Sequence, residues 1–167
     1  MTVTIYDFSI PPMIRVLSNL SKILDKAVAQ AKERDIPLDY LVAARLAADM
    51  RPLTFQIQTA SDTSKGCAAR LAGITAPAMA DTETSFPELQ ERIAKTIAFL
   101  ESVKPEQVAG AENREIVLKF PSGEMKFSGR DYVTGFALPN FYFHVTTAYA
   151  ILRSNGINIG KRDFLGG

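Results

Sequence analysis

The sequence has very few of the residues that build metal clusters and disulfide frameworks. It contains one cysteine, Cys67, one histidine, His144, and no tryptophan. A single cysteine excludes an intramolecular disulfide and any zinc or iron–sulfur site made from several cysteines. A single histidine excludes every metal site that takes two or more imidazoles from one chain.

An excess of charge of one sign is also missing. The chain carries 19 basic and 18 acidic side chains, which leaves a formal net charge of +1. A nucleic-acid-binding domain would show a clustered positive excess, so we expect no nucleic-acid partner. Residues 1–8 have no basic leader pattern and the chain has no cysteine pair, so we predict a cytoplasmic protein.

One charge-free run, residues 132–152, is long enough to cross a bilayer. It contains Thr134, Asn140 and His144, together with Gly135 and Pro139. Because polar groups are costly in lipid, the run is better explained as a buried helix than as a membrane span. We therefore expect no membrane partner.

The residues that are present indicate a globular, helical chain. Hydrophobic residues make up 47% of the sequence and charged residues 22%, and 167 residues suit one domain spanning 1–167. Apolar residues at helical spacing predict helices over residues 9–34, 40–73 with a break at Pro52, 85–104 and 128–155. Alternating residues on both sides of Pro121-Ser122-Gly123 predict a short β-hairpin. The predicted fold class is all-α, an antiparallel four-helix bundle with a hairpin before the last long helix.

Several polar residues on these helices are candidates for a functional site. His144 lies on an apolar stripe, and it is either a metal ligand or general base, or a core histidine satisfied by hydrogen bonds. Asn140 precedes it by one helical turn. Asp49 and Gln56 have helical spacing, so both could enter the core, where a carboxylate would need a metal ion or His144 as partner. The alternative is a surface Asp49. Tyr142 is a candidate ligand-binding residue, although aromatic residues at helical spacing often pack in cores.

Two segments carry a resemblance to a known family. The runs are PNFYFHVTTAYAILR at residues 139–153, with the following 155–166, and LAADMRPLTFQ at residues 46–56. The chain resembles an uncharacterised domain-of-unknown-function family within the DinB/YfiT-like metalloenzyme superfamily. The resemblance implies a four-helix bundle, frequently a homodimer, and some relatives in that superfamily are thiol-dependent transferases or isomerases.

The superfamily's metal site uses one histidine of the second helix and an H-x-x-x-H pair of the last long helix. This sequence offers His144, but Asn140 and Ala148 stand four residues away, and Asp49 or Gln56 stands in the second-helix region. The resemblance therefore implies a reduced site with His144 and Asp49 as catalytic or metal-ligating residues, and Asn140, Gln56 and Tyr142 as ligand-binding residues. Whether a divalent metal ion binds, or no cofactor, stays open.

Two functions follow as expectations. The first is a small-molecule transferase or hydrolase, thiol-dependent or metal-assisted, with a site that is not a three-histidine site. The second is a non-catalytic dimeric helical bundle that binds a small ligand or has a structural role.

Overall fold

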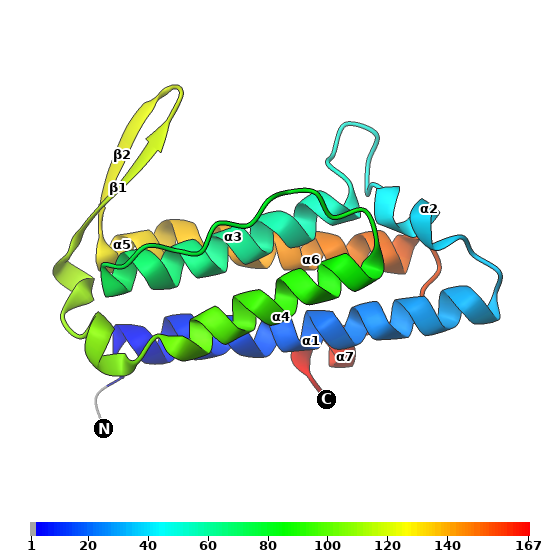
Figure 1. The fold of residues 1–167 in the computed structure, drawn as a ribbon, viewed down its shortest axis with the longest axis horizontal. Helices are drawn as coiled ribbons and strands as arrows, with labels where there is room; N and C mark the ends of the chain where they lie inside the picture. Colours follow the sequence, from blue (N-terminus) through cyan, green and yellow to red (C-terminus); the bar gives the residue numbers. More distant parts are fainter. Residues whose placement is uncertain (1–2) are drawn as a thin grey trace.

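The structure, a computed structural model, describes residues 3–167 and is mostly helical (Figure 1). Four long helices lie side by side: α1 (Ile5–Glu33), α3 (Leu53–Ala72), α4 (Phe86–Ser102) and α6 (Leu138–Ser154). The shorter elements are α2 (Leu38–Ala43), the 3₁₀ turns η1 (Pro105–Val108) and η2 (Ala111–Asn113), strands β1 (Glu115–Phe120) and β2 (Gly123–Ser128), α5 (Gly129–Tyr132), the π-helical turn η3 (Val133–Ala137) and α7 (Lys161–Leu165).

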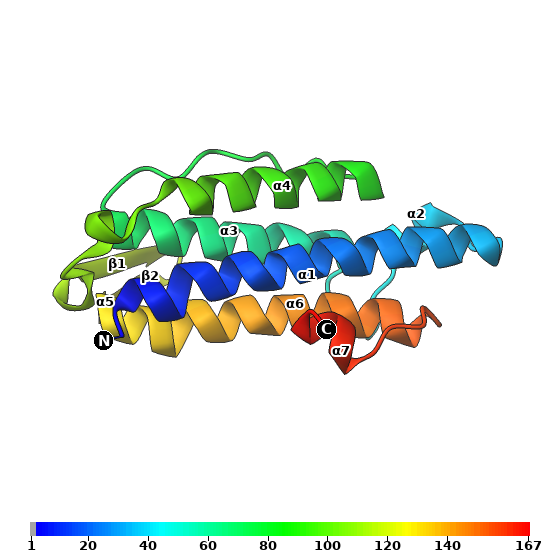
Figure 2. The ribbon, with the colours of Figure 1, turned by 90° about the horizontal axis from the view of Figure 1, so that it is seen from below.

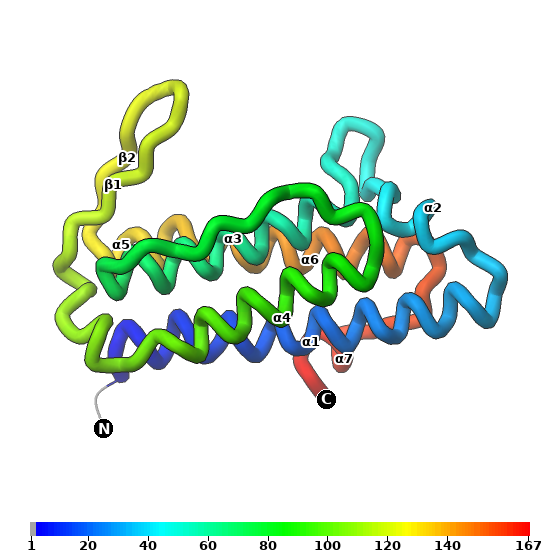
Figure 3. Tube along the Cα trace, viewed as in Figure 1, coloured from blue at the N-terminus to red at the C-terminus, as the bar shows by residue number. Residues whose placement is uncertain are grey.

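The helix directions differ from the predicted arrangement of antiparallel neighbours with short connections. Helices α1 and α6 run one way along the long axis, and α3 and α4 both run the other way (Figures 1 and 2). Residues 74–84, which we call the strap, run back along the molecule to join the end of α3 to the start of α4 (Figure 3). An extended chain advances roughly 3.3 Å per residue, so this strap reaches about 36 Å, which exceeds the roughly 25 Å of α4.

Arg92 of α4 fixes the strap to the helices. Its guanidinium is ion-paired with Asp81 and Glu83 of the strap and with Asp62 of α3, at N···O distances of 3.0, 2.8 and 2.7 Å. It also donates to the Ala80 carbonyl at 3.1 Å. The Arg92 side chain is 1% exposed. The strap is therefore held in place by one buried group, the guanidinium of Arg92.

The first helix begins earlier than the sequence pattern predicted. We expected Ser9 as the N-cap, but Thr4 caps α1, and Asp7 accepts a hydrogen bond from the Thr4 amide in a capping box. Pro11 and Pro12 then lie inside the helix. The reciprocal cap satisfies the orphan amides of the first turn and extends the helix by about one turn.

The second predicted helix is interrupted over residues 44–52. Helix α2 ends at Ala43, and α3 begins at Leu53 with Pro52 as its N-cap residue. Proline has no amide proton and disfavours helical backbone in the preceding residue, which explains why α3 begins after Pro52. The helix predicted over residues 44–51 does not form. Gly73 ends α3 in the left-handed region at φ 68°, as the sequence predicted.

Two other sequence predictions are confirmed. Ser85 and Glu88 form a capping box at the start of α4. The hairpin pairs β1 with β2 in antiparallel register, from Glu115 opposite Ser128 to Phe120 opposite Gly123. The hairpin projects from one side of the helices (Figure 1).

The last long helix is continuous from α5 through η3 into α6. A proline inside a regular α-helix would clash with the carbonyl four residues earlier. Here the carbonyl four residues before Pro139 belongs to Gly135, inside the π-helical turn, where the backbone is wider. The predicted helix over residues 128–155 therefore contains a local defect that its apolar pattern did not indicate.

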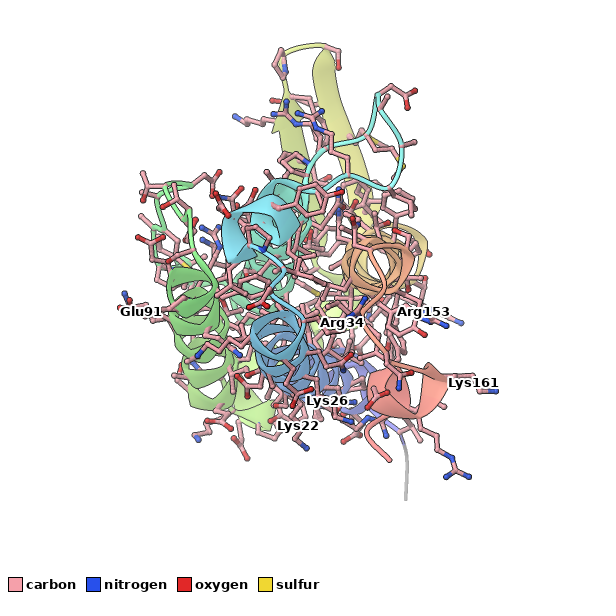
Figure 4. All side chains as sticks on the ribbon, turned by 90° about the vertical axis from the view of Figure 1, so that its right-hand side faces the viewer. Lys22, Lys26, Arg34, Glu91, Arg153 and Lys161 are labelled. Atoms are coloured by element: carbon pink, nitrogen blue, oxygen red, sulfur yellow. The ribbon has the colours of Figure 1, made fainter. Side chains whose placement is uncertain are left out.

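The tail packs against α1 through α7. Asp163 of α7 is ion-paired with Lys26, and Asn19 donates to the Phe164 carbonyl at 3.1 Å. In the end-on view, α7 lies on the side of the molecule opposite the hairpin (Figure 4). Asp163 therefore anchors the tail to α1. Over residues 3–167, no helix combines the length and the apolar character that crossing a membrane requires.

Candidate functional site

A row of polar residues follows the contact between α3 and the last long helix. On α3, Gln56, Thr63 and Arg70 stand seven residues apart, so they lie on one face at intervals of about 10.5 Å. Each makes a hydrogen bond to a residue of the last long helix, and those partners are His144, Asn140 and Tyr132. We call these six residues the polar seam. Antiparallel packing of α3 on α6 explains why rising numbers on α3 meet falling numbers on the partner.

His144 is oriented by Gln56. The imidazole Nδ1 lies 2.8 Å from Gln56 Oε1. The amide orientation of Gln56 is fixed because its Nε2 donates to the Arg51 carbonyl at 2.9 Å, which leaves Oε1 to face the ring. Oε1 can only accept, so Nδ1 carries the proton. In the neutral ring, Nε2 therefore has a free lone pair.

The second ring nitrogen of His144 is available to solvent. His144 is 9% exposed, and burial lowers its pKa from the usual 6.5, which favours the neutral ring at neutral pH. Among residues 3–167, the Nε2 atom of His144 makes no hydrogen bond. It is also not fully buried, because the fully buried side-chain atoms without a hydrogen bond are Ser61 Oγ and Arg92 Nε. The edges of Phe55 and Phe143 border the ring at centroid distances of 6.0 and 5.2 Å. Two aromatic rings therefore border the neutral imidazole.

Asn140 does not bind His144, although one helical turn separates them. Its Nδ2 donates to Thr63 Oγ1 at 2.8 Å. Asn140 therefore belongs to the contact between α3 and α6 and does not order the histidine. The histidine is ordered from α3 instead.

Arg70 and Tyr132 form the third contact of the seam. Arg70 Nη1 donates to the Tyr132 hydroxyl at 3.1 Å, and its guanidinium carbon lies 5.7 Å from the centroid of the same ring. Tyr132 is 1% exposed, and burial raises its pKa to about 12. The tyrosine therefore stays protonated and acts as a fixed hydrogen-bonding partner.

The structure does not place Asp49 on a helix. It lies exposed in the loop between α2 and α3, because the helix starts only after Pro52. The expected helical spacing of Asp49 and Gln56 is therefore wrong. The residues described show no contact between Asp49 and His144, so a site shared by the two stays a prediction.

Tyr142 lies on another side of α6. Residues two apart on a helix point about 200° apart, so Tyr142 faces away from both Asn140 and His144. Its ring packs edge-on against Phe141, with a centroid distance of 5.4 Å. Cys67 is buried, and burial raises its pKa to about 12, so its thiol stays protonated.

The donor set does not fit a three-histidine metal site. The seam offers one imidazole, while the amides of Gln56 and Asn140 are engaged with His144, Arg51 and Thr63. Over residues 3–167, there is no group of three or more His, Cys, Asp or Glu side chains that could hold a metal ion.

Sequence reasoning missed Thr63, Arg70 and Tyr132. A signal for two of them existed: polar residues recur every seven positions from Gln56, beside the apolar stripe of α3. Tyr132 gave no comparable signal, because it precedes α6 and reaches the seam only through the π-helical turn.

Comparisons with known proteins agree with this fold. A family model described as domain of unknown function DUF1993 matches residues 5–165. A solved structure described as a DinB family member protein from Shewanella denitrificans is 41% identical, with a TM-score of 0.91. The alignment covers 97% of this chain and 92% of that one. A search of curated proteins gives no match. The chain therefore belongs to the DUF1993 family, within the DinB-like superfamily.

Proposed function

We propose that the protein acts on a small molecule at the polar seam, with His144 as the general base. The observation that carries the proposal is the free Nε2 of a neutral imidazole, oriented through Nδ1 by Gln56. A base whose other nitrogen is held by a hydrogen bond is positioned for proton transfer. The transferase or hydrolase class suggested by the sequence is part of this proposal.

The proton balance is simple. A thiol or hydroxyl of the bound molecule gives its proton to Nε2, and the resulting thiolate or alkoxide attacks the electrophilic atom of the second reactant. The bond from that atom to its leaving group breaks, and the imidazolium returns the proton from Nε2 to the leaving group. The imidazolium keeps its Nδ1 hydrogen bond to Gln56 Oε1, so the ring does not need to move. Because Gln56 is neutral, it orients the ring without raising the pKa of His144 as a carboxylate would.

The test uses the fact that the chain has one histidine. Diethyl pyrocarbonate acylates neutral, accessible imidazoles, so we expect a single adduct at His144 and none in His144→Gln. A small-thiol library screened by thermal shift should give hits with the wild type that are lost in His144→Gln. Unmodified His144, or hits unchanged in His144→Gln, would contradict the proposal.

A measurement of metal content distinguishes the two roles considered for His144, general base and metal ligand. Elemental mass spectrometry of protein prepared without a histidine tag or chelator should find no stoichiometric metal in wild type or His144→Ala. Near-stoichiometric metal in the wild type that disappears in the variant would show that His144 is a metal ligand, with Asp49 as the second ligand predicted from the sequence. That result would contradict the role of His144 as a general base.

The homodimer expected from the resemblance also belongs to the proposal. Phe143, which stands beside His144, is 57% exposed, a large fraction for a phenylalanine. In the non-catalytic alternative, this face binds a second copy or a small ligand. Sedimentation velocity at micromolar concentration tests the dimer, and a monomer there would count against it.

A further inference from the structure

A small pocket lies at the far end of the seam from His144, between α3 and the hairpin. Its volume is about 200 Å³. One side is aromatic and comprises Phe120 of β1, Tyr132 and Phe136, with Tyr132 and Phe136 stacked at a centroid distance of 6.0 Å. The other side is polar and contains Thr63 and Arg70 of α3. The pocket therefore suits a molecule with an apolar body and a polar end.

The position of Arg70 at this pocket is built into α3. Gly66, one turn before it, has no side chain, and a Cβ there would lie 2.5 Å from Arg70 Nη1. A glycine inside a helix is costly in conformational entropy, and here it leaves the space in which the guanidinium folds back along the helix. Tyr132 holds one Nη1 donor, so the remaining N–H groups of the planar fork stay available.

A hydroxyl donor adds to the guanidinium. Thr63 Oγ1 accepts the hydrogen bond from Asn140, so its own O–H is free to donate, and no acceptor for it exists among residues 3–167. Thr63 and Arg70 are seven residues apart and lie on the same face of α3. Two kinds of donor therefore line one pocket wall.

The charges around the pocket also favour an anion. Lys119 of β1 adds a cation, and its partner Glu124 is 3.6 Å away in an exposed pair. The acidic residue of the lining, Asp62, is already paired with two cations, Arg92 at 2.7 Å and Lys65 at 2.8 Å. Arg92 is shared with Asp81 and Glu83, so Lys65 of α3 is the cation that balances the carboxylate of Asp62.

From these contacts we infer that the pocket binds a small organic carboxylate whose apolar body lies against the rings of Tyr132 and Phe136. Arg70 receives the carboxylate through its open donors, and Thr63 donates to it as well. The inference does not depend on His144 being a base, because neither His144 nor Gln56 lines the pocket.

The experiment is an isothermal titration of the full chain with benzoate. We expect saturable binding in the millimolar range, because Arg70 is exposed. Arg70→Gln should weaken binding about tenfold, which is the loss of roughly one charge-assisted hydrogen bond. Arg153→Gln removes the same charge from an exposed site on α6 and should leave binding unchanged.

Gly66→Ala is a second test variant, and its expected effect on binding is not explained by a general loss of structure. Alanine improves helix propensity, so thermal stability should be kept, while the added Cβ displaces the Arg70 guanidinium and weakens benzoate binding. Unsaturable binding by the wild type, or equal binding by Arg70→Gln, would overturn the inference. Acetate or inorganic phosphate binding as tightly as benzoate would overturn the role of the aromatic wall. Because His144 does not line the pocket, His144→Gln should bind benzoate as the wild type does, whether or not His144 is a base.

Discussion

At the scale of single residues, His144 combines two environments. Its Nδ1 faces a fixed acceptor between two helices, whereas its Nε2 reaches solvent between two aromatic edges. A fully buried core histidine would have both nitrogens satisfied, and a surface histidine would have a pKa near its usual value. Partial burial with one oriented nitrogen lowers the pKa and keeps a lone pair available.

This pKa shift predicts how stability depends on pH. In the unfolded chain the imidazole takes up a proton near pH 6.5, while in the folded chain it does so only at lower pH. The unfolded state therefore binds more protons in that window, and the free energy of unfolding falls as the pH falls below 6.5. Urea denaturation of the wild type and His144→Gln, from about pH 7 to about pH 5, should show a flatter profile for the variant.

An NMR titration of the single imidazole gives the direct check. The folded protein should show a pKa below 6.5, and Gln56→Glu should raise it, because a carboxylate favours the imidazolium. A wild-type value at or above 6.5 would refute both the stability prediction and its cause.

At the scale of elements, the strap makes parallel packing of α3 and α4 possible. A short loop can join only antiparallel neighbours, so a connection as long as the helix itself is needed here. Arg92 holds that connection from inside, and Gln58 of α3 donates to Glu83 at 2.9 Å. Burial alone would raise the pKa of Glu83, but the hydrogen bonds from Arg92 and Gln58 outweigh it and the pKa is lowered.

Replacing this guanidinium should release the strap. Arg92→Ala removes the charge that Asp81 and Glu83 face, and it leaves a cavity between α3 and α4. We expect a loss of about 2–3 kcal/mol, below the roughly 3–5 kcal/mol of a fully buried pair, because Asp62 and Asp81 remain partly solvated. Urea denaturation measures the loss, and limited proteolysis should cut within residues 74–84.

A neighbouring residue provides the matched control. Lys95 also lies on α4, but its ion pair with Glu91 is exposed on both sides. Lys95→Ala should change stability by less than about 0.5 kcal/mol and leave the strap resistant. Equal proteolysis of both variants would show that Arg92 is not the clamp.

At the scale of the whole molecule, the tail joins the end of the chain to its first helix. Gln30 makes reciprocal hydrogen bonds with the backbone of Asn158, at 3.2 and 2.7 Å, and Arg34 donates to the Gly156 carbonyl at 2.5 Å. Phe164 packs edge-on against Tyr149 of α6, so α7 bridges two long helices.

Removal of residues 160–167 should therefore destabilise the protein. The half-buried Phe164 ring and the buried Asn19 lose their partners, and we expect a cost of about 1–3 kcal/mol, mostly from the ring. Lys26→Ala breaks only the exposed ion pair to Asp163 and should cost less than about 1 kcal/mol. Thermal denaturation compares the two, and an equal loss in both would attribute the anchoring to the ion pair rather than to packing.

Parts of the site were predictable from local patterns. His144, Asn140 and Gln56 stood out as polar residues at core positions of predicted helices, and the structure places all three in the seam. Their pairing was not predictable, because the sequence does not specify which turn of one helix meets which turn of another. Asp49 was misplaced because the chain leaves the helix already after Ala43, ahead of the single residue that Pro52 restricts, and the spacing of residues 49–56 does not indicate this.

Local sequence patterns account for the four long helices, the capping box of α4 and the hairpin, because hydrophobic periodicity, capping boxes and turn residues act over a few neighbouring positions. Three features arise only in the folded chain: α3 and α4 run parallel, Gln56 orients His144, and Gly66 leaves room for Arg70 beside Tyr132. Those features depend on side chains from distant segments meeting at a packed interface. Their geometry is set by the packing of the whole chain, which no local pattern encodes.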